Sequence, residues 1–379
     1  MFERNREVRF EPGWLVLRDG FRLPGDFVVL GSVPSGPVVS EVVFNTSMSG
    51  YEEVISDPSY YGQMICFTTA QLGNYGLTGV DRQSSRVWVS AVLAPRYTSS
   101  VSNYAARSSL AALLAESGVP LFVNFDARKL VRHIREAGAI PGALTSGDPY
   151  DAHRMLEDAT GTEGKDLVSA VTTREPYTLL PEDRGDSPQG QPLVVVDYGV
   201  KKMMLESLSW EWPIEVVPAT YGTEDILALD PRAVFLSNGP GDPGALTPQI
   251  ETVAGLLGRV PVAGICLGHQ LLALALGAET YKLRFGHHGS NHPVLRGHDS
   301  RVSITAQNHN YAVSEASLAK TATRSVVTHR NLFDGVVEGV RYPEARALSV
   351  QYHPEAAPGP LEERGYMLEQ LVGLLGEAE

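Results

Sequence analysis

The sequence has little cysteine and no long run of apolar residues. Its two cysteines, Cys66 and Cys266, are too few for a disulfide framework in 379 residues, so we expect a reducing compartment, the cytoplasm. No apolar run approaches the ~20 residues of a membrane-spanning helix, and residues 1–7 lack the hydrophobic core of a signal peptide. A formal net charge of −13 argues against nucleic acid or an anionic membrane as the partner.

The length of the chain predicts more than one domain. A chain of 379 residues exceeds what one hydrophobic core usually supports, and a hydrophobic content of 43% is ample for two cores. Residues 176–191 are polar and rich in Pro and Gly, which is typical of a linker. We therefore predict an N-terminal domain over 1–175 and a second domain over 192–379.

The two halves differ in their expected secondary structure. Strand-like runs before the linker lie at 14–18, 27–30, 42–44, 64–67 and 86–93, and helical patterns lie at 107–117 and 128–137. This half predicts a mixed α+β domain. Short apolar runs after the linker lie at 193–196, 214–217, 233–236 and 261–265, with helical stretches between them. Such alternation predicts an α/β domain with a doubly wound, mostly parallel sheet.

Cys266 lies in the segment Gly-Ile-Cys-Leu-Gly-His-Gln, residues 264–270, between an apolar strand and an apolar helix. A residue on so tight a strand-to-helix turn presents its side chain out of the sheet, as a nucleophile elbow does. The helix N-terminus favours negative charge on the sulfur. A buried packing role is the commoner fate of cysteine, but packing alone does not require the flanking glycines.

A base and an orienting group are present in Ser-Val-Gln-Tyr-His-Pro-Glu, residues 349–355. Residues 347–352 read as a short strand that Pro354 ends, which places His353 at a strand end where catalytic groups of α/β sheets lie. Glu355 could accept the imidazole N–H and fix the tautomer, as the third member of a triad does. An isolated His-Pro-Glu would be a solvated turn, but together with the cysteine elbow it predicts a triad.

The segment Leu-Ser-Asn-Gly-Pro-Gly-Asp-Pro, residues 236–243, also follows a predicted strand. Attack on an acyl carbon creates an oxyanion, which needs preorganised N–H donors. Leu267 offers one N–H directly after the cysteine. Because Pro240 has no N–H, the second donor would be Gly239 or Gly241.

These three motifs, in this order, resemble the signature of class I glutamine amidotransferases. Further segments resemble the narrower family of carbamoyl-phosphate synthase small chains, and they lie at 44–53, 57–60, 72–76, 126–130, 285–293 and 306–313. The resemblance covers nearly the whole chain. The motifs of the first half are the most specific, because other amidotransferases of the class lack that domain.

The resemblance implies roles for individual residues. Cys266 is implied as the nucleophile, His353 as the base and Glu355 as the orienting group. The implied glutamine contacts are Ser47, Gly239, Gly241, Leu267, Gln270, Asn308, Asn310 and Tyr311. The family usually has Gly-Phe where this chain has Asn310-Tyr311, and asparagine is the side chain that best accepts a left-handed backbone at such a position.

The resemblance also implies the activity and its partner. It implies hydrolysis of L-glutamine through a cysteine thioester, with ammonia passing to a separate large synthetase chain in a hetero-oligomer. That large chain would make carbamoyl phosphate for arginine and pyrimidine biosynthesis, using bicarbonate and ATP with Mg. This chain has no Gly-rich phosphate loop ending in Lys-Ser or Lys-Thr, so we expect no cofactor here and ATP chemistry elsewhere.

Four histidines, His287, His288, His292 and His309, raise the question of a metal. Imidazole is a common zinc ligand, but no cysteine or carboxylate lies among them at ligand spacing. We therefore predict no metal site. Three other functions remain open, namely the glutaminase of a different synthetase, a free-standing cysteine hydrolase of γ-glutamyl amides or peptides, and a non-catalytic binding subunit.

Overall fold

The computed structural model of the chain describes residues 8–30, 35–180, 190–209 and 212–376. They form two compact units, residues 1–163 with 284–288 and residues 164–283 with 289–379. This division falls before the predicted linker at 176–191. Strand β8 (Tyr177–Leu179) lies in that segment and pairs with β10 (Ile214–Pro218), a long-range pairing that composition does not reveal. Residues 181–189 of the predicted linker lie outside the described residues.

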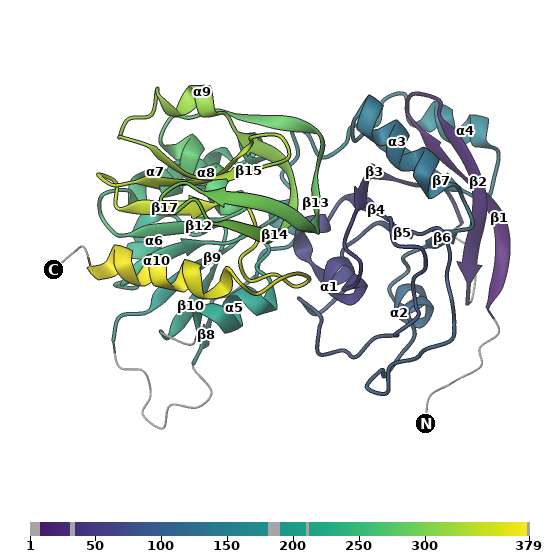
Figure 1. Cartoon of the computed structure of the whole chain (residues 1–379), viewed down its shortest axis with the longest axis horizontal. Coiled ribbons are helices and arrows are strands. Elements are labelled where there is room, and N and C mark those ends of the chain that lie inside the picture. Colours follow the sequence, from purple (N-terminus) through teal and green to yellow (C-terminus); the bar gives the residue numbers. More distant parts are fainter. Residues whose placement is uncertain (1–7, 31–34, 181–189, 210–211, 377–379) are drawn as a thin grey trace. The chain divides into compact units, whose positions relative to one another are not determined.

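The first unit is a closed barrel with the strand order β1-β2-β6-β5-β4-β3-β7 (Figure 1). Its strands are β1 (Arg9–Leu17), β2 (Arg22–Val29), β3 (Val38–Asn45), β4 (Gln63–Phe67), β5 (Ala91–Leu93), β6 (Leu121–Val123) and β7 (Pro141–Thr145). Pairs β3–β4, β4–β5 and β5–β6 are parallel, and the pairs of β1, β2 and β7 with their neighbours are antiparallel. The mixed class agrees with the prediction, but the closure of the sheet was not predicted.

Helices pack on both sides of the barrel strands. They are α1 (Tyr51–Ser56), α2 (Leu110–Glu116), α3 (Ala127–Ala137) and α4 (Pro149–Met155), with a 3-10 helix at Pro58–Tyr60. Because side chains alternate along a strand, Ile65 packs in one cluster with α1 and α2, whereas Met64 and Cys66 pack in another with α3. Cys66 is fully buried, which confirms the prediction for its strand.

The strand predicted over 86–93 is wrong in its first part, since β5 begins only at Ala91. The Trp88 N–H donates to the carbonyl oxygen of Ile55 at the end of α1, at 2.9 Å. Trp88 therefore bonds to a helix end instead of a neighbouring strand. The β-branched and aromatic composition of this run could not distinguish the two.

The second unit is built on a ten-stranded sheet of order β14-β13-β15-β16-β17-β12-β11-β9-β10-β8. Its remaining strands are β9 (Leu193–Asp197), β11 (Ala233–Leu236), β12 (Val262–Ile265), β13 (Thr280–Arg296), β14 (Val302–Val313), β15 (Val326–Asn331), β16 (Val337–Tyr342) and β17 (Ala347–Val350). The centre, β10-β9-β11-β12-β17, is parallel, and β8 and β16 flank it antiparallel. The predicted doubly wound fold is confirmed, with antiparallel strands added at its edges.

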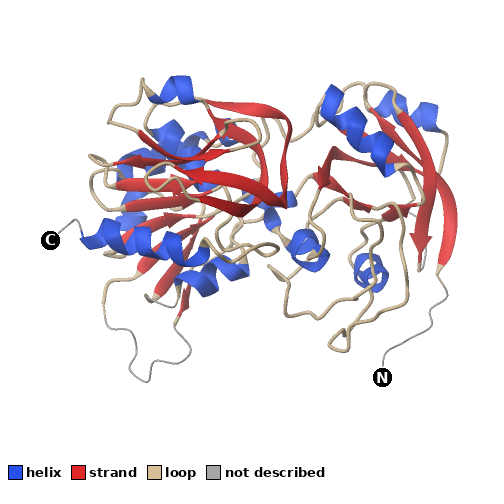
Figure 2. Cartoon of the chain, viewed as in Figure 1, coloured by secondary structure: helices blue, strands red, loops and turns tan. Residues whose placement is uncertain are grey.

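Helices cover both faces of this sheet (Figure 2). They are α5 (Lys202–Leu208), α6 (Thr223–Leu227), α7 (Thr247–Leu256), α8 (Leu267–Ala275), α9 (Glu315–Leu318) and α10 (Arg364–Gly376), with 3-10 helices at Val168–Ala170 and Pro243–Ala245. Val194 and Val196 of β9 pack in the cluster that holds α6, α7 and α8. Val195 packs in the cluster that holds α5 and α10. The fully apolar strand predicted there is apolar because both of its faces are buried.

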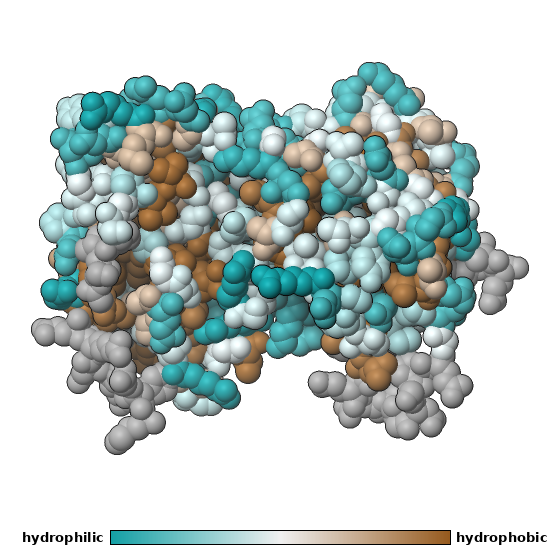
Figure 3. Space-filling view, turned by 180° about the vertical axis from the view of Figure 1, so that it is seen from behind, coloured by the Kyte–Doolittle hydropathy of each residue, from teal (hydrophilic) through white to brown (hydrophobic). Residues whose placement is uncertain are grey.

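The surface shows apolar residues as separate brown patches among hydrophilic ones on the face drawn in Figure 3. Exposed large apolar side chains include Met48, Tyr104, Tyr150, Phe333 and Leu361. Among the described residues, every helix is too short or too polar to cross a bilayer.

The turn from β12 into α8 is shaped by two close backbone contacts. A Cβ on Gly268 would lie 2.2 Å from the carbonyl oxygen of Leu236, and one on Gly264 would lie 2.7 Å from the carbonyl carbon of Gly268. Cys266 between them has φ 55°, a left-handed value that is strained for a side chain other than glycine. The two glycines therefore let α8 start directly against the sheet edge.

We predict that Gly268→Ala lowers the free energy of unfolding by about 3 kcal/mol, because the added methyl group meets backbone that cannot yield. Gly373→Ala on α10 is the matched control, since a Cβ added there would have no atom of the described residues within 4 Å. That control should be unchanged or more stable by up to about 1 kcal/mol. Urea unfolding followed by circular dichroism measures both, and equal stability of the two variants would contradict the packing account.

Candidate active site

The parallel strands of the second unit end along one edge, where α/β folds hold their catalytic groups. Cys266 directly follows β12, and His353 comes three residues after the end of β17. Lys201 comes four residues after the end of β9, and the loop with Gly239 follows β11. Residues far apart in sequence thus meet at this edge.

Cys266 is the N-cap residue of α8, directly before its first helical residue, and it is buried. Its N–H donates to the Val350 carbonyl oxygen at 2.9 Å, which ties the elbow to β17. Its Sγ lies 3.4 Å from the carbonyl oxygen of Asn308 on β14, which accepts from the thiol. Leu267 is the first helical residue, so its N–H has no acceptor within the helix and is open to an anion.

His353 is held by hydrogen bonds on its backbone and on its ring. Its N–H donates to the carbonyl oxygen of Ala306 on β14 at 2.8 Å. Its Nδ1 lies 2.7 Å from Oε1 of Glu355. Because an ionised carboxylate only accepts, the proton sits on Nδ1 and leaves Nε2 for other chemistry.

The Cys266 sulfur lies near the imidazole, since it raises the pKa of His353. Within the described part of the chain, however, Nε2 has no partner that meets the usual distance and angle limits. A near contact of this kind is common before substrate binds, and it tightens in the complex. The structure therefore brings Cys266, His353 and Glu355 together, and their catalytic roles stay predictions.

A fourth residue completes this group. Nζ of Lys201 lies 2.7 Å from Oε1 of Glu355, and it donates to the carbonyl oxygen of Ala356 at 2.6 Å. Both charged side chains are buried. Lys201 was not predicted, although its place shortly after the apolar run 193–196 and before a helix was a signal for it.

The charges explain the protonation states. Burial alone would lower the pKa of the His353 imidazole, but the Glu355 carboxylate and the Cys266 sulfur outweigh burial and raise that pKa. Burial alone would raise the pKa of Glu355, but the ammonium of Lys201 and the ring of His353 hold it below its usual range. The group therefore favours an imidazolium against an ionised Glu355.

The glycine loop after β11 lies against the start of α8. A Cβ on Gly239 would lie 2.3 Å from the Tyr198 carbonyl oxygen and 2.7 Å from a methyl carbon of Leu267, so only glycine fits there. Gly241 has φ 95°, which also favours glycine. Asn238 anchors the loop, since its Nδ2 donates to the Gly199 carbonyl oxygen at 2.8 Å. The N–H of Gly239 or Gly241 as an oxyanion donor stays a prediction.

The predicted glutamine contacts of the second unit gather beside Cys266. Nε2 of Gln270 donates to the Tyr311 carbonyl oxygen at 2.8 Å and to Oε1 of Gln351 at 3.0 Å. Asn308, Asn310 and Tyr311 lie on β14. Ser47 belongs to the first unit, where its N–H donates to Oδ1 of Asn45, and its contact with glutamine stays a prediction.

Two details of this segment differ from the sequence analysis. Asn310 does not have a left-handed backbone, because it lies in the extended strand β14, where any residue is accommodated. The 349–355 motif indicated no role for Gln351, yet this residue is fully buried and its Oε1 accepts from Gln270.

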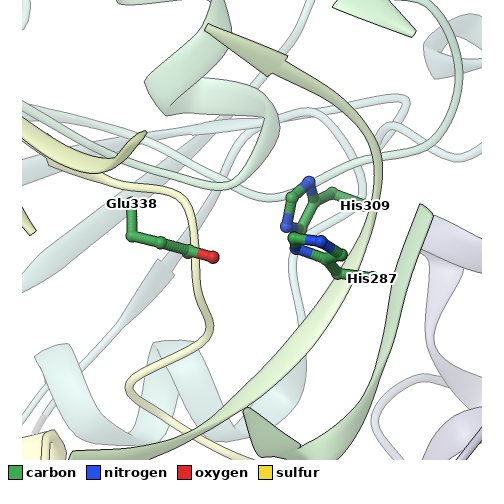
Figure 4. A group of neighbouring side chains, drawn as sticks. All are labelled: His287, His309 and Glu338. Atoms are coloured by element: carbon green, nitrogen blue, oxygen red, sulfur yellow. The ribbon is translucent and has the colours of Figure 1, made fainter. Parts of the chain in front are cut away.

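The four histidines of the sequence analysis divide between the units, with His287 and His288 in the first and His292 and His309 in the second. The His309 ring and the carboxylate of Glu338 point toward each other in Figure 4. One ring nitrogen of His309 and one oxygen of Glu338 lie within 4.8 Å. A buried carboxylate thus lies near His309, which the sequence spacing did not show. The absence of a metal stays a prediction.

Comparison with known proteins bears on both units. The family description "Glutamine amidotransferase class-I" matches residues 194–370, and "Carbamoyl-phosphate synthase small chain, CPSase domain" matches residues 15–144. Among solved structures, a glutamine amidotransferase from Thermotoga maritima covers 50% of this chain and 86% of its own, at 17% identity and a TM-score of 0.34. That likeness is too distant to carry an argument.

Two curated relatives are much more similar. The carbamoyl phosphate synthase small chain of Chlorobaculum tepidum is 44% identical over 348 residues, 90% of this chain and 92% of the relative. The carbamoyl phosphate synthase small chain of Xylella fastidiosa is 43% identical over 362 residues, 92% of this chain and 95% of the relative. The resemblance stated from the motifs is confirmed. The chain belongs to the family of carbamoyl phosphate synthase small chains, and its second unit is a class-I glutamine amidotransferase domain.

Proposed function

We propose that this chain hydrolyses the side-chain amide of L-glutamine through a thioester on Cys266. The observation that carries the proposal is that β14 holds both residues, the Cys266 thiol at the Asn308 carbonyl oxygen and the His353 N–H at the Ala306 carbonyl oxygen. The Nδ1 of that same His353 is bonded to Glu355. These residues would supply the three groups that acyl transfer requires, namely a nucleophile, a base and a group that orients the base.

In the first half of the reaction, Cys266 attacks the amide carbon of glutamine while His353 holds the thiol proton. The oxyanion lies against the Leu267 N–H and an N–H of Gly239 or Gly241. His353 then gives its proton to the leaving nitrogen, and ammonia departs. A γ-glutamyl thioester on Cys266 remains.

In the second half, water adds to the thioester carbon, and His353 takes a proton from that water. The second oxyanion occupies the same site as the first. Collapse breaks the carbon–sulfur bond, and the sulfur regains its proton. The sum is glutamine and water giving glutamate and ammonia, with Cys266 restored.

We also propose where the ammonia goes. Family membership supports transfer to a large carbamoyl phosphate synthase chain that uses ATP, Mg and bicarbonate for arginine and pyrimidine biosynthesis. In water the ammonia would be protonated and lost, which is a physical reason for this chain to work docked to that partner. Both cysteines are free, and a thiol nucleophile fits a reducing compartment such as the cytoplasm.

We predict that a diazoketone analogue of glutamine labels Cys266 and not Cys66, as located by mass spectrometry of the digested protein. Cys66 is fully buried, and burial raises the pKa of its thiol to about 12, so it is a poor nucleophile. Cys266→Ser should abolish ammonia release from glutamine, whereas Cys66→Ala should retain it. Labelling of Cys66, or ammonia release by Cys266→Ser, would contradict the mechanism.

We predict that the large carbamoyl phosphate synthase chain of the same organism raises the glutaminase rate of this chain at least tenfold. The rate is measured as glutamate formed with and without that chain, and an unrelated protein of similar size is the control. An unchanged rate would favour the alternative of a free-standing hydrolase.

We predict that the Lys201–Glu355 ion pair contributes to the free energy of unfolding. Removing one partner of a buried ion pair costs about 3–5 kcal/mol, so Lys201→Met should lose that much unfolding free energy at neutral pH. The folded-state pKa of Glu355 is lowered, so the stability it contributes is present above its unfolded pKa of ~4.3 and is lost as pH falls through the folded value. The difference between wild type and Lys201→Met should therefore shrink in acid.

The matched control for that prediction is Lys202→Met. Lys202 pairs with Glu206 at 3.3 Å on the surface of α5, where both side chains are about half exposed. Exposed pairs contribute little, so this control should stay within about 0.5 kcal/mol of wild type at every pH. Urea titrations between pH 2 and pH 8 measure both variants, which covers the range below pH ~4.3 where the contribution of Glu355 is lost. Equal stability of the two variants at neutral pH would show that Lys201 does not compensate the buried charge of Glu355.

A further inference from the structure

Glu338 is a fully buried carboxylate that the proposed chemistry does not use. It lies on β16, and its Oε1 accepts from Nδ2 of Asn331 at 2.8 Å and from Nε2 of Gln307 at 3.0 Å. Burying a carboxylate is costly unless its neighbours compensate the charge. The hydrogen-bond partners of Glu338 therefore indicate whether it supports the fold or the candidate site.

A path of hydrogen bonds leads from Glu338 to the predicted glutamine contacts. Oε1 of Gln307 lies 3.0 Å from Nε2 of His309, and Nδ1 of His309 lies 2.8 Å from the carbonyl oxygen of Tyr311. That same carbonyl oxygen accepts from Nε2 of Gln270. The carboxylate on β16 is thus connected through two side chains of β14 to a residue of the helix that directly follows Cys266.

Two further hydrogen bonds turn this path into a closed ring. Gln270 also donates to Oε1 of Gln351, and the N–H of Gln351 donates to the carbonyl oxygen of Glu338 at 2.9 Å. Gln351 lies two residues before His353. This hydrogen-bonded ring, made by Glu338, Gln307, His309, Gln270 and Gln351 with the Tyr311 carbonyl, is buried throughout.

The hydrogen bonds of the ring need one proton more than a neutral His309 and an ionised Glu338 would have together. The Tyr311 carbonyl oxygen only accepts, so Nδ1 of His309 carries a hydrogen. Because the Gln307 amide donates to Glu338, its oxygen faces Nε2 of His309, which then carries a second hydrogen. If the amide were turned over, two oxygens would face each other and the carboxyl group would need that proton instead. In the first arrangement the Glu338 carboxylate balances the charge of His309, and in the second the Glu338 carboxyl group carries the proton itself.

We propose that Glu338 is a positioning residue for glutamine, which acts through Gln307 and His309 to hold the Tyr311 carbonyl and the Gln270 amide in place. This inference rests on the proposed function, because it assigns the ring to glutamine binding at that same site. The ring leaves the reacting atoms untouched, since Cys266 and His353 are held by other bonds. Loss of Glu338 should therefore weaken binding and spare the chemistry.

The test compares Glu338→Gln with wild type in the whole chain. The glutamine side chain keeps an oxygen for Asn331 and Gln307 but carries no charge to balance the proton of His309. A hydrogen bond to a charged group is worth about one tenfold factor or more, so the KM for glutamine should rise about tenfold while kcat stays within twofold. Alkylation of Cys266 by iodoacetamide without glutamine should also stay within twofold, and protection should need about tenfold more glutamine.

Glu363→Gln is the matched control, because Glu363 is also a buried carboxylate of the second unit. It accepts from the hydroxyl groups of Tyr352 and Ser303 and lies outside the ring. Its KM should stay within twofold of wild type. Gln307→Leu breaks the ring at its centre, so adding Glu338→Gln to it should raise KM no further, as expected for two residues that act through one path.

Two results would overturn the inference. One is a KM of Glu338→Gln within twofold of wild type. The other is an equal fall of kcat, alkylation rate and glutamine affinity, which would make Glu338 a general support of the fold. Failure of wild type to release ammonia from glutamine would instead reject the proposed function.

Discussion

A carboxylate buried at the sheet edge stays ionised because an ammonium group lies against it. Lys201 and Glu355 are 2.7 Å apart, and both are almost fully shielded from water. Without that cation, burial would favour the protonated carboxyl group, and a protonated Glu355 could no longer orient the imidazole as an acceptor alone. The orientation of His353 toward Cys266 therefore depends on a pair in which neither member reacts.

One strand, β14, connects the separate parts of the site. Its carbonyl oxygens at Ala306, Asn308 and Tyr311 accept from the His353 N–H, the Cys266 thiol and the Gln270 amide. Alternate carbonyls point the same way along a strand, so residues 306 and 308 set the spacing of base and nucleophile. The antiparallel part of the sheet is thus bonded to residues of the parallel part that are predicted to act in catalysis and in glutamine binding.

Much of this site could be predicted from sequence because its motifs follow strands. Cys266 and the glycine loop each come directly after a short apolar run, and parallel strands bring their carboxyl ends to one edge. Lys201 could not be assigned a role in this way, because its partner Glu355 is distant in sequence and only the fold joins them. The ring of Glu338 was hidden for the same reason, since it joins residues of β14, α8 and β16 with the residue directly after β17.

The fold was less predictable where pairing is long-range. Closure of the barrel depends on β1 pairing with both β2 and β7, and no local pattern reports the second pairing. The same holds for β8, whose three residues lie in a Pro- and Gly-rich segment and join the sheet only through β10. The tolerance of asparagine for a left-handed backbone is not needed at Asn310, because the surrounding twelve-residue strand decides its conformation.

We propose that one sulfur atom at this edge forms and releases a glutamyl thioester. The most direct test is a crystal structure of the protein frozen during turnover with glutamine. The account predicts continuous density from Sγ of Cys266 to a glutamyl carbonyl carbon, with the carbonyl oxygen within hydrogen-bond distance of the Leu267 N–H. An acyl group on any other residue, or a carbonyl oxygen turned away from that N–H, would contradict it.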